Sequence, residues 1–212
     1  MNSRMPKPVL YGADYSVYVR IARMALAEKG IGYDLVPVDV FAEGGPPDWY
    51  LERHPFARIP AFEHDGFRLF ETGAVTRYVD EAFDGPSLQP ADARGRAVMN
   101  QIVGLIDSYA YRAMVWDVAV ERLETSPPDE TRIAGGLRIA DTALRVLTAL
   151  KRPGDWLLGG QPTLADLHLA PVIAYFLKTE EGRSLLAAFP LIEDWWAKAS
   201  ARASFAATEK AG

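Results

Sequence analysis

The sequence contains no cysteine among its 212 residues. This absence excludes disulfide bonds, thiolate metal sites, a cysteine nucleophile and a dithiol redox motif carried by the protein. Any sulfur that reacts here must therefore belong to a ligand. The three histidines, His54, His64 and His168, lie far apart and lack the spacing of metal ligands, so the sequence predicts no metal site.

Blocks of basic residues and long apolar runs are also absent. The 28 acidic and 23 basic residues are spread along the chain and give a net charge of -5, so the electrostatic pattern of a nucleic-acid or anionic-membrane partner is missing. Every apolar stretch, including the longest at 167–177, ends well short of the ~20 residues of a bilayer-spanning helix. Asp14 interrupts the apolar run that a signal peptide would need. We therefore expect a folded cytoplasmic protein.

The first 84 residues alternate between strand and helix patterns. Short apolar or alternating runs predict four strands, at residues 8–11, 33–40, 60–63 and 67–70. Helical periodicity predicts helices at 17–29 and at 72–83. Pro37 favours an edge position for the second strand, because proline cannot donate a ladder hydrogen bond. The βαβ-ββα order implies a parallel strand pair with a right-handed crossover, followed by an antiparallel hairpin.

The rest of the chain is predicted to be helical. A linker is indicated by the Gly, Pro, Ser and Asp residues of 84–93. Helical periodicity then covers residues of about 93–124, 129–151, 163–178, 182–187 and 190–203. Thr163 and Asp166 have the spacing of a capping box. We expect an α/β domain at 1–84, a linker at 85–93 and an all-α domain at 94–212.

Four segments carry a family resemblance, namely VLYGADYSVYVR (9–20), HPFARIPAFEHDGFRLFETGAVTRYV (54–79), LLGGQPTLADLHLAPVI (157–173) and WWAKASARASF (195–205). In this order and spacing they resemble the glutathione transferase superfamily, and within it the serine-type phi and theta classes. The resemblance covers essentially the whole chain. It implies a thioredoxin-like N-terminal domain, a helical C-terminal domain, glutathione as co-substrate without a metal, and a homodimer.

Ser16 matches the catalytic serine of these classes, five positions after Tyr11. A thiol with a pKa near ~8.5 is only a few per cent thiolate at neutral pH, so glutathione has to be activated. The Ser16 hydroxyl, the unpaired N–H groups of the following helix and its dipole would all favour a thiolate. Taken alone, Ser16 is more simply the N-cap of that helix. Tyr11 is the alternative activator, because other classes use a tyrosine near the end of the first strand, and Tyr15 and Tyr18 also compete for the role.

The resemblance also assigns residues that hold glutathione. Ile59 would pair its main-chain N–H and C=O with the cysteinyl moiety, in a geometry fixed by a cis bond to Pro60. Glu71 and Thr72 match the pair that binds the γ-glutamyl end, although Thr72 also suits a simple helix cap.

One part of the family pattern is missing. The loop at 43–47 has no counterpart of the His-Lys pair that binds the glycyl carboxylate in phi-class proteins. Arg58 stands where the family commonly has Gln, and its longer cationic side chain is the candidate to reach that carboxylate from the other side, with a solvated surface arginine as the alternative interpretation.

The expected function is a glutathione S-transferase, in which serine-assisted thiol activation serves attack on a small, soft, hydrophobic electrophile. The alternative is a binding or regulatory protein of the same fold with little catalysis. The missing basic pair favours this alternative, whereas the intact set of Ser16, Pro60, Glu71 and Thr72 argues against it. Disulfide reduction through a protein thiol is excluded by the absence of cysteine. The sequence does not identify the electrophile.

Overall fold

The computed structural model describes residues 6–209 and divides into two compact units. The first unit contains the chain up to Pro86 together with the segment that begins at Ala207, and the second unit is Ser87–Ala206. The sequence predicted one change of unit, within residues 85–93. The structure adds a second change at Ala207, where the chain returns to the first unit.

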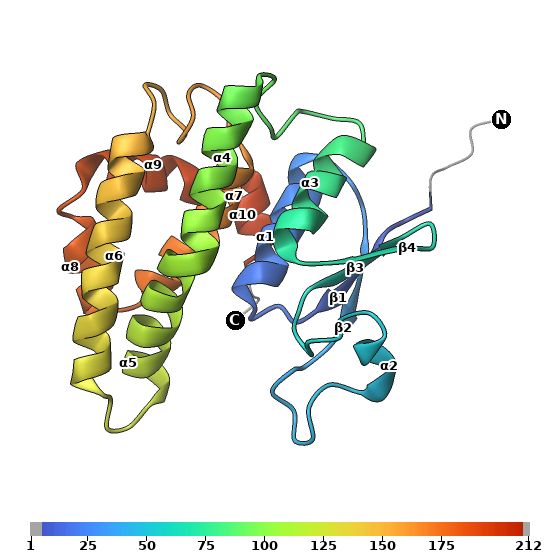
Figure 1. Ribbon diagram of the computed structural model, residues 1–212, viewed down its shortest axis with the longest axis horizontal. Coiled ribbons are helices and arrows are strands. Elements are labelled where there is room, and N and C mark those ends of the chain that lie inside the picture. The colour runs from blue at the N-terminus through green and yellow to red at the C-terminus, as the bar shows by residue number, and fades with distance from the viewer. Residues whose placement is uncertain (1–5, 210–212) are drawn as a thin grey trace. The chain divides into compact units, whose positions relative to one another are not determined.

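A four-stranded mixed sheet forms the centre of the first unit (Figure 1). Its strands are β1 (Val9–Gly12), β2 (Asp34–Pro37), β3 (Ala61–His64) and β4 (Phe67–Phe70), in the spatial order β2-β1-β3-β4. β1 and β2 are parallel, whereas β3 is antiparallel to both β1 and β4. All four predicted strands are therefore present. Pro37 lies on an edge strand, as its missing N–H requires.

Helices cover both faces of this sheet. α1 (Val17–Glu28) and α3 (Thr72–Ala82) pack against each other on one face, and the short α2 (Asp48–Leu51) lies by the other (Figure 1). Because side chains alternate along a strand, Leu10 and Tyr11 of β1 point to opposite faces. Tyr11 forms a buried cluster with Val38, Tyr50 and Ala61, so α2 caps a second small core.

α2 was not predicted. The stretch at 41–57 carries no strand or helix pattern, because a helix of four residues is too short to leave a hydrophobic period. Tyr50 of this helix is fully buried, and tertiary packing therefore stabilises α2 where periodicity gave no signal.

The second unit is helical, as predicted. It contains α4 (Ala93–Leu105), α5 (Glu121–Glu124), α6 (Glu130–Leu150), α7 (Leu164–Phe176), α8 (Glu180–Leu186) and α9 (Pro190–Ser200), and α10 (Ala203–Ala207) leads out of it. Between α4 and α5 the helix widens into two π-helical segments, η1 (Ile106–Ala110) and η2 (Arg112–Val120). A change of hydrogen-bond register leaves no mark in the apolar pattern, so the sequence predicted one uninterrupted helix at 93–124.

α7 forms the core of the second unit. It is apolar on nearly all sides, and its residues are buried from Leu164 to Ile173. The predicted capping box of Thr163 and Asp166 is present at its start. The buried Asp166 carboxylate accepts hydrogen bonds from Thr163 N (2.7 Å), Leu157 N (2.8 Å) and Trp195 Nε1 (2.8 Å). Along residues 6–209, no helix combines the length and the apolar composition of a membrane span.

Candidate functional site

Ser16 closes the turn after β1 and is the N-cap of α1. The turn brings the backbone of Gly12 close to α1, since a Cβ at Gly12 would lie 2.4 Å from Val19 Cγ2. The Ser16 Oγ accepts a hydrogen bond from the Val19 N–H at 3.3 Å, and the hydroxyl hydrogen remains able to donate to another group. Ser16 is half-buried and has an extended backbone conformation, with φ -78° and ψ 125°. This places one hydroxyl donor and the positive end of a helix together.

Tyr11 occupies a different environment. Its ring is buried in the small core under α2, and the Arg53 guanidinium lies 4.9 Å above the ring centroid. The Tyr11 hydroxyl donates to Glu63 Oε2 at 3.5 Å. Tyr11 thus acts as a core residue of the sheet.

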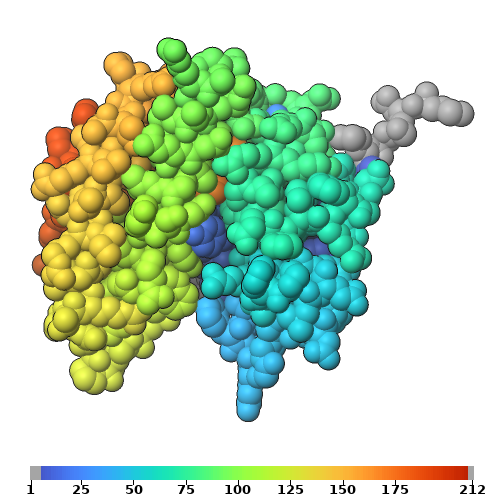
Figure 2. All heavy atoms as spheres, viewed as in Figure 1, coloured from blue at the N-terminus to red at the C-terminus, as the bar shows by residue number. Residues whose placement is uncertain are grey.

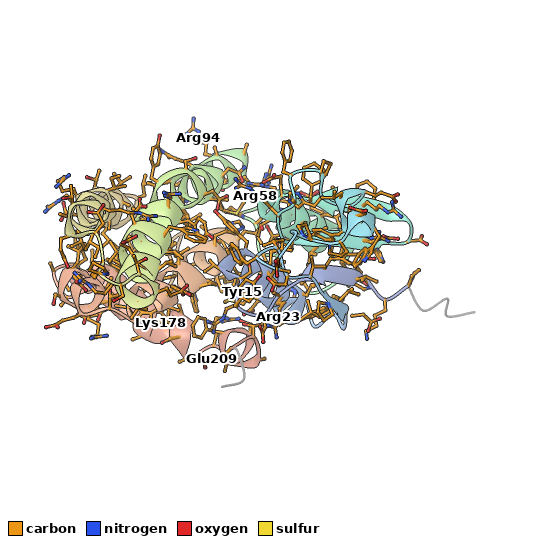
Figure 3. All side chains as sticks on the ribbon, turned by 90° about the horizontal axis from the view of Figure 1, so that it is seen from below. Tyr15, Arg23, Arg58, Arg94, Lys178 and Glu209 are labelled. Atoms are coloured by element: carbon orange, nitrogen blue, oxygen red, sulfur yellow. The ribbon has the colours of Figure 1, made fainter. Side chains whose placement is uncertain are left out.

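The Tyr15 hydroxyl is also engaged. It donates to Asp39 Oδ1 at 2.8 Å, and the Phe41 N–H donates to the same oxygen at 2.9 Å. Burial and the Asp39 carboxylate raise the pKa of Tyr15 to about 12, so its phenol is neutral near pH 7. Tyr15 and Arg58, both labelled in Figure 3, come from the turn after β1 and the segment before β3.

The segment before β3 is held by α2. The Ile59–Pro60 bond is cis, as the resemblance implies. The Tyr50 hydroxyl donates to the Arg58 carbonyl at 2.6 Å, directly before the residue that begins the cis bond. Burial raises the pKa of Tyr50, which therefore stays a phenol donor at neutral pH.

Glu71 and Thr72 lie at the start of α3. Glu71 has φ 70° and ψ 113°, which is a strained conformation for a residue other than glycine. Its carbonyl accepts from Ala74 N and Val75 N, but its own side chain makes no capping hydrogen bond to the helix. The first N–H groups of α3 therefore lie beside the exposed Glu71 carboxylate and the buried Thr72.

His54 also lies in this region. The sequence excluded His54 as a metal ligand and indicated no other role for it. It is 3% exposed, and its ring lies 4.9 Å from that of Phe70 and 6.4 Å from that of Tyr50. Burial lowers the pKa of His54, and the nearby Glu71 carboxylate acts in the opposite direction. Nothing in the linear sequence marks a histidine as buried, so only the fold could identify it.

The loop after β2 is exposed at residues 41–45 and projects from the first unit (light blue in Figure 2). From Val38 to Pro47 its charged residues are Asp39 and Glu43, and both are acidic. Arg58 is exposed, so its guanidinium is open to a ligand, while its carbonyl is held by Tyr50.

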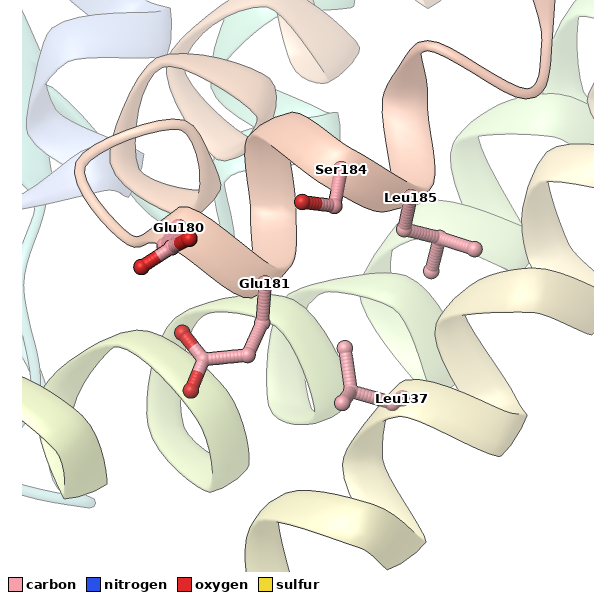
Figure 4. A pocket seen from close by; sticks show the side chains of 5 residues that line it. All are labelled: Leu137, Glu180, Glu181, Ser184 and Leu185. Atoms are coloured by element: carbon pink, nitrogen blue, oxygen red, sulfur yellow. The ribbon is translucent and has the colours of Figure 1, made fainter.

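An open depression lies elsewhere, in the second unit. Leu137 of α6 lines it together with four residues of α8, namely Glu180, Glu181, Ser184 and Leu185 (Figure 4). Glu181 is already paired with Arg122 at 2.7 Å. None of the residues predicted for the site lines this depression. Across the described residues, 6–209, no three acidic or histidine side chains come together to hold a metal ion.

Two family models match the chain. Residues 10–87 match the glutathione S-transferase N-terminal domain, and residues 118–203 match the glutathione S-transferase C-terminal domain. Together the two models span more than half of the sequence. The first one covers every residue that the sequence analysis assigned to the site.

Individual relatives agree with these models. Glutathione S-transferase F13 of Arabidopsis thaliana is 28% identical over 202 residues, which is 92% of each chain. Maleylacetoacetate isomerase of Rattus norvegicus is 29% identical over 172 residues, covering 79% of this chain and 77% of that protein. Among solved structures, glutathione S-transferase III in its apo form has a TM-score of 0.82 at 29% identity, covering 96% of this chain and 95% of its own. Glutathione transferase F7 from Populus trichocarpa gives 0.81 at 28% identity, with 95% and 97% covered.

Proposed function

The chain belongs to the glutathione S-transferase family, and on that basis we propose that it is an enzyme in which Ser16 activates the thiol of glutathione for attack on a soft, hydrophobic electrophile. The observation that carries this proposal is the geometry of Ser16. Its Oγ accepts the Val19 N–H, which leaves the hydroxyl hydrogen to donate to a sulfur at the N-terminus of α1.

Activation of the glutathione thiol requires a hydrogen-bond donor near the sulfur, and it does not require a strongly basic side chain to remove the proton. A donor aimed at the sulfur stabilises the thiolate more than the thiol, so the thiol loses its proton at a lower pH. The first-turn N–H groups and the dipole of α1 act in the same direction. The thiol proton passes to water. The thiolate sulfur then forms a C–S bond with the electrophile, either as a leaving group departs with its bonding electrons or by addition to an activated double bond, whose carbanion takes a proton from water. Tyr11 and Tyr15 are poor alternatives, because the Tyr11 ring is buried in the small core under α2 and the Tyr15 hydroxyl already donates to Asp39.

The tripeptide would be held where β1 ends and β3 begins. Pairing of Tyr11 with Ala61 brings the turn that carries Ser16 and the cis-proline segment to the same end of the sheet. Ile59 supplies backbone groups for the cysteinyl moiety, and Pro60 fixes their direction. Glu71 meets the γ-glutamyl ammonium, while Thr72 and the first-turn N–H groups of α3 meet its carboxylate. The strained backbone of Glu71 supports this role, since such strain persists where a site requires it.

Arg58 is proposed to bind the glycyl carboxylate in place of the missing basic pair. Arg58→Ala should raise the KM for glutathione, and Arg68→Ala is the matched control, because Arg68 is also surface-exposed but pairs with Glu63 at 3.2 Å. If both variants keep the wild-type KM, Arg58 has no part in binding.

The test of the proposed function compares Ser16→Ala with Tyr11→Phe. In an assay with glutathione and an aryl halide, Ser16→Ala should lose about 10²-fold in kcat, the usual effect of removing one donor from a developing charge. Its glutathione affinity should be nearly unchanged. Tyr11→Phe should retain activity, because the Tyr11 hydroxyl faces Glu63. The reverse result would assign activation to Tyr11.

A second candidate function is a glutathione-binding protein with little catalysis, which is favoured by the acidic loop after β2. Retention of the wild-type protein on immobilised glutathione without turnover of an aryl halide would select it. In either case we propose a homodimer in the cytoplasm, the compartment in which glutathione is kept reduced. Light scattering of the purified protein checks the dimer.

A further inference from the structure

Tyr15 connects the turn that carries Ser16 with the loop after β2. The Tyr15 hydroxyl donates to Asp39 Oδ1 at 2.8 Å, and the same oxygen accepts the Phe41 N–H at 2.9 Å. The rings of Tyr15 and Phe41 lie 5.8 Å apart at an interplanar angle of 36°. The Tyr15–Asp39 hydrogen bond and the contact between the rings of Tyr15 and Phe41 therefore join the two segments, and Tyr15 and Asp39 are 24 residues apart in the chain.

We propose that Tyr15 is a positioning residue for Ser16. Its bond to Asp39 fixes the turn at residues 13–16 against the loop at 38–41, and so holds the Ser16 hydroxyl in the direction of the bound thiol. This inference rests on the proposed role of Ser16. It also gives the loop after β2 a function that does not require basic residues.

The remaining bonds of the turn show why an external tether matters. The Ser16 N–H reaches the Ala13 carbonyl at 3.2 Å, and the Ser16 Oγ receives the Val19 N–H at 3.3 Å. Both distances lie at or just beyond the long end of the 2.7–3.2 Å range of an N–H···O bond. The Ser16 carbonyl accepts the Arg20 N–H at 2.9 Å, so the backbone of Ser16 is anchored to α1, and the longer contacts restrain the turn before it and the hydroxyl less firmly. The 2.8 Å bond of Tyr15 has the usual length for an O–H donor and ends on a carboxylate, which strengthens it.

Tyr15 acts through Ser16 and does not activate the thiol directly. A phenol has one hydrogen to donate, and the Tyr15 hydrogen is used by Asp39. Asp39 in turn is satisfied by two donors, which hold the pKa of its carboxyl below the ordinary value and keep it ionised as an acceptor.

Tyr15→Phe keeps the ring and removes the tether, and Tyr33→Phe is the matched control. Tyr33 lies directly before β2 in the same unit, and its hydroxyl accepts from Arg23 Nε at 2.9 Å. Loss of one hydrogen bond of about 1 kcal/mol corresponds to about fivefold. We expect kcat of Tyr15→Phe to fall by about fivefold with KM for glutathione unchanged, and the thiolate absorbance of bound glutathione to titrate about 0.7 unit higher. Tyr33→Phe should leave both unchanged.

Variants of Asp39 give an independent check. Asp39→Asn retains an acceptor oxygen for the phenol and should stay near wild type, whereas Asp39→Ala should behave like Tyr15→Phe. Combining Asp39→Ala with Tyr15→Phe should add no further loss, because both remove the same bond. Additive losses would contradict the proposal.

Hydrogen exchange tests the tether without glutathione. Tyr15→Phe should speed exchange at the amides of Ser16, Val19 and Phe41, and Tyr33→Phe should not. If Tyr15→Phe exchanges faster but the wild-type protein forms no glutathione thiolate, the tether stands and the proposed function is overturned. Unchanged exchange, or a Tyr15→Phe protein with wild-type thiol titration, would overturn the role of Tyr15 even if Ser16→Ala abolishes activity.

Discussion

The hydroxyl of Tyr50 donates a 2.6 Å hydrogen bond to the carbonyl of Arg58, one residue before the cis Ile59–Pro60 bond. Tyr50 is fully buried in α2, a helix of four residues. A short helix without a periodic signal thereby holds the backbone to which the cysteinyl part of glutathione would bind.

Removal of this hydroxyl should affect both stability and binding. Tyr50→Phe keeps the ring in its core position but leaves the Arg58 carbonyl without its partner. We expect the free energy of unfolding to fall by about 1–3 kcal/mol and glutathione affinity to fall as well. Urea denaturation and calorimetric titration with glutathione measure the two effects. Loss of stability with unchanged affinity would show that the segment keeps its geometry without the bond.

Variants of Glu71 should separate stability from function. Glycine tolerates φ 70°, so Glu71→Gly releases backbone strain, whereas Glu71→Gln retains it. Compared with the wild type, Glu71→Gly should have an equal free energy of unfolding or one up to about 2 kcal/mol higher. Relief of backbone strain offsets the larger conformational entropy that glycine gives the unfolded chain. Both variants should bind glutathione more weakly than wild type. A Glu71→Gln protein with wild-type affinity would remove the carboxylate from the site.

Stability should depend on the protonation of His54. Burial lowers the pKa of His54 in the folded protein below the ordinary value of about 6.5, so the unfolded chain binds a proton more readily. The contribution of neutral His54 is complete above that value and is lost as the pH falls towards the folded pKa. Urea midpoints should therefore decline between about pH 7.5 and about pH 5.5. His54→Phe, which keeps an aromatic ring beside Phe70, should decline less steeply, and equal slopes would contradict this assignment.

Asp166 should matter more to stability than a surface acid would. Asp166→Ala leaves the Trp195 Nε1 and two backbone N–H groups without an acceptor in the core. For Asp166→Ala we expect the free energy of unfolding to fall by about 3 kcal/mol or more. For Trp195→Phe, loss of the hydrogen bond should lower it by about 1 kcal/mol, in addition to the effect of the smaller side chain on packing. Denaturation followed by circular dichroism measures both. Similar losses in the two variants would show that the carboxylate contributes only its bond to Trp195.

Much of the fold follows from local patterns. The alternation at 60–63 and 67–70 with a turn between them predicted the β3–β4 hairpin, and Asp65 and Gly66 adopt the positive φ values that such a turn needs. Pro37 predicted its edge strand through the missing N–H. The spacing of Thr163 and Asp166 predicted the cap of α7. In each case the physical cause acts over a few residues.

What the sequence by itself determined is therefore the α/β unit, the helical unit and the absence of any protein thiol, because period, turn chemistry and composition are properties of short segments. The tertiary structure decided which hydroxyls are already engaged. It placed Tyr11 against Glu63 and Tyr15 against Asp39, and it left Ser16 with a hydrogen to donate at the start of α1. These partners lie 24 to 52 residues away in the chain, and only the folded sheet brings them within hydrogen-bonding distance.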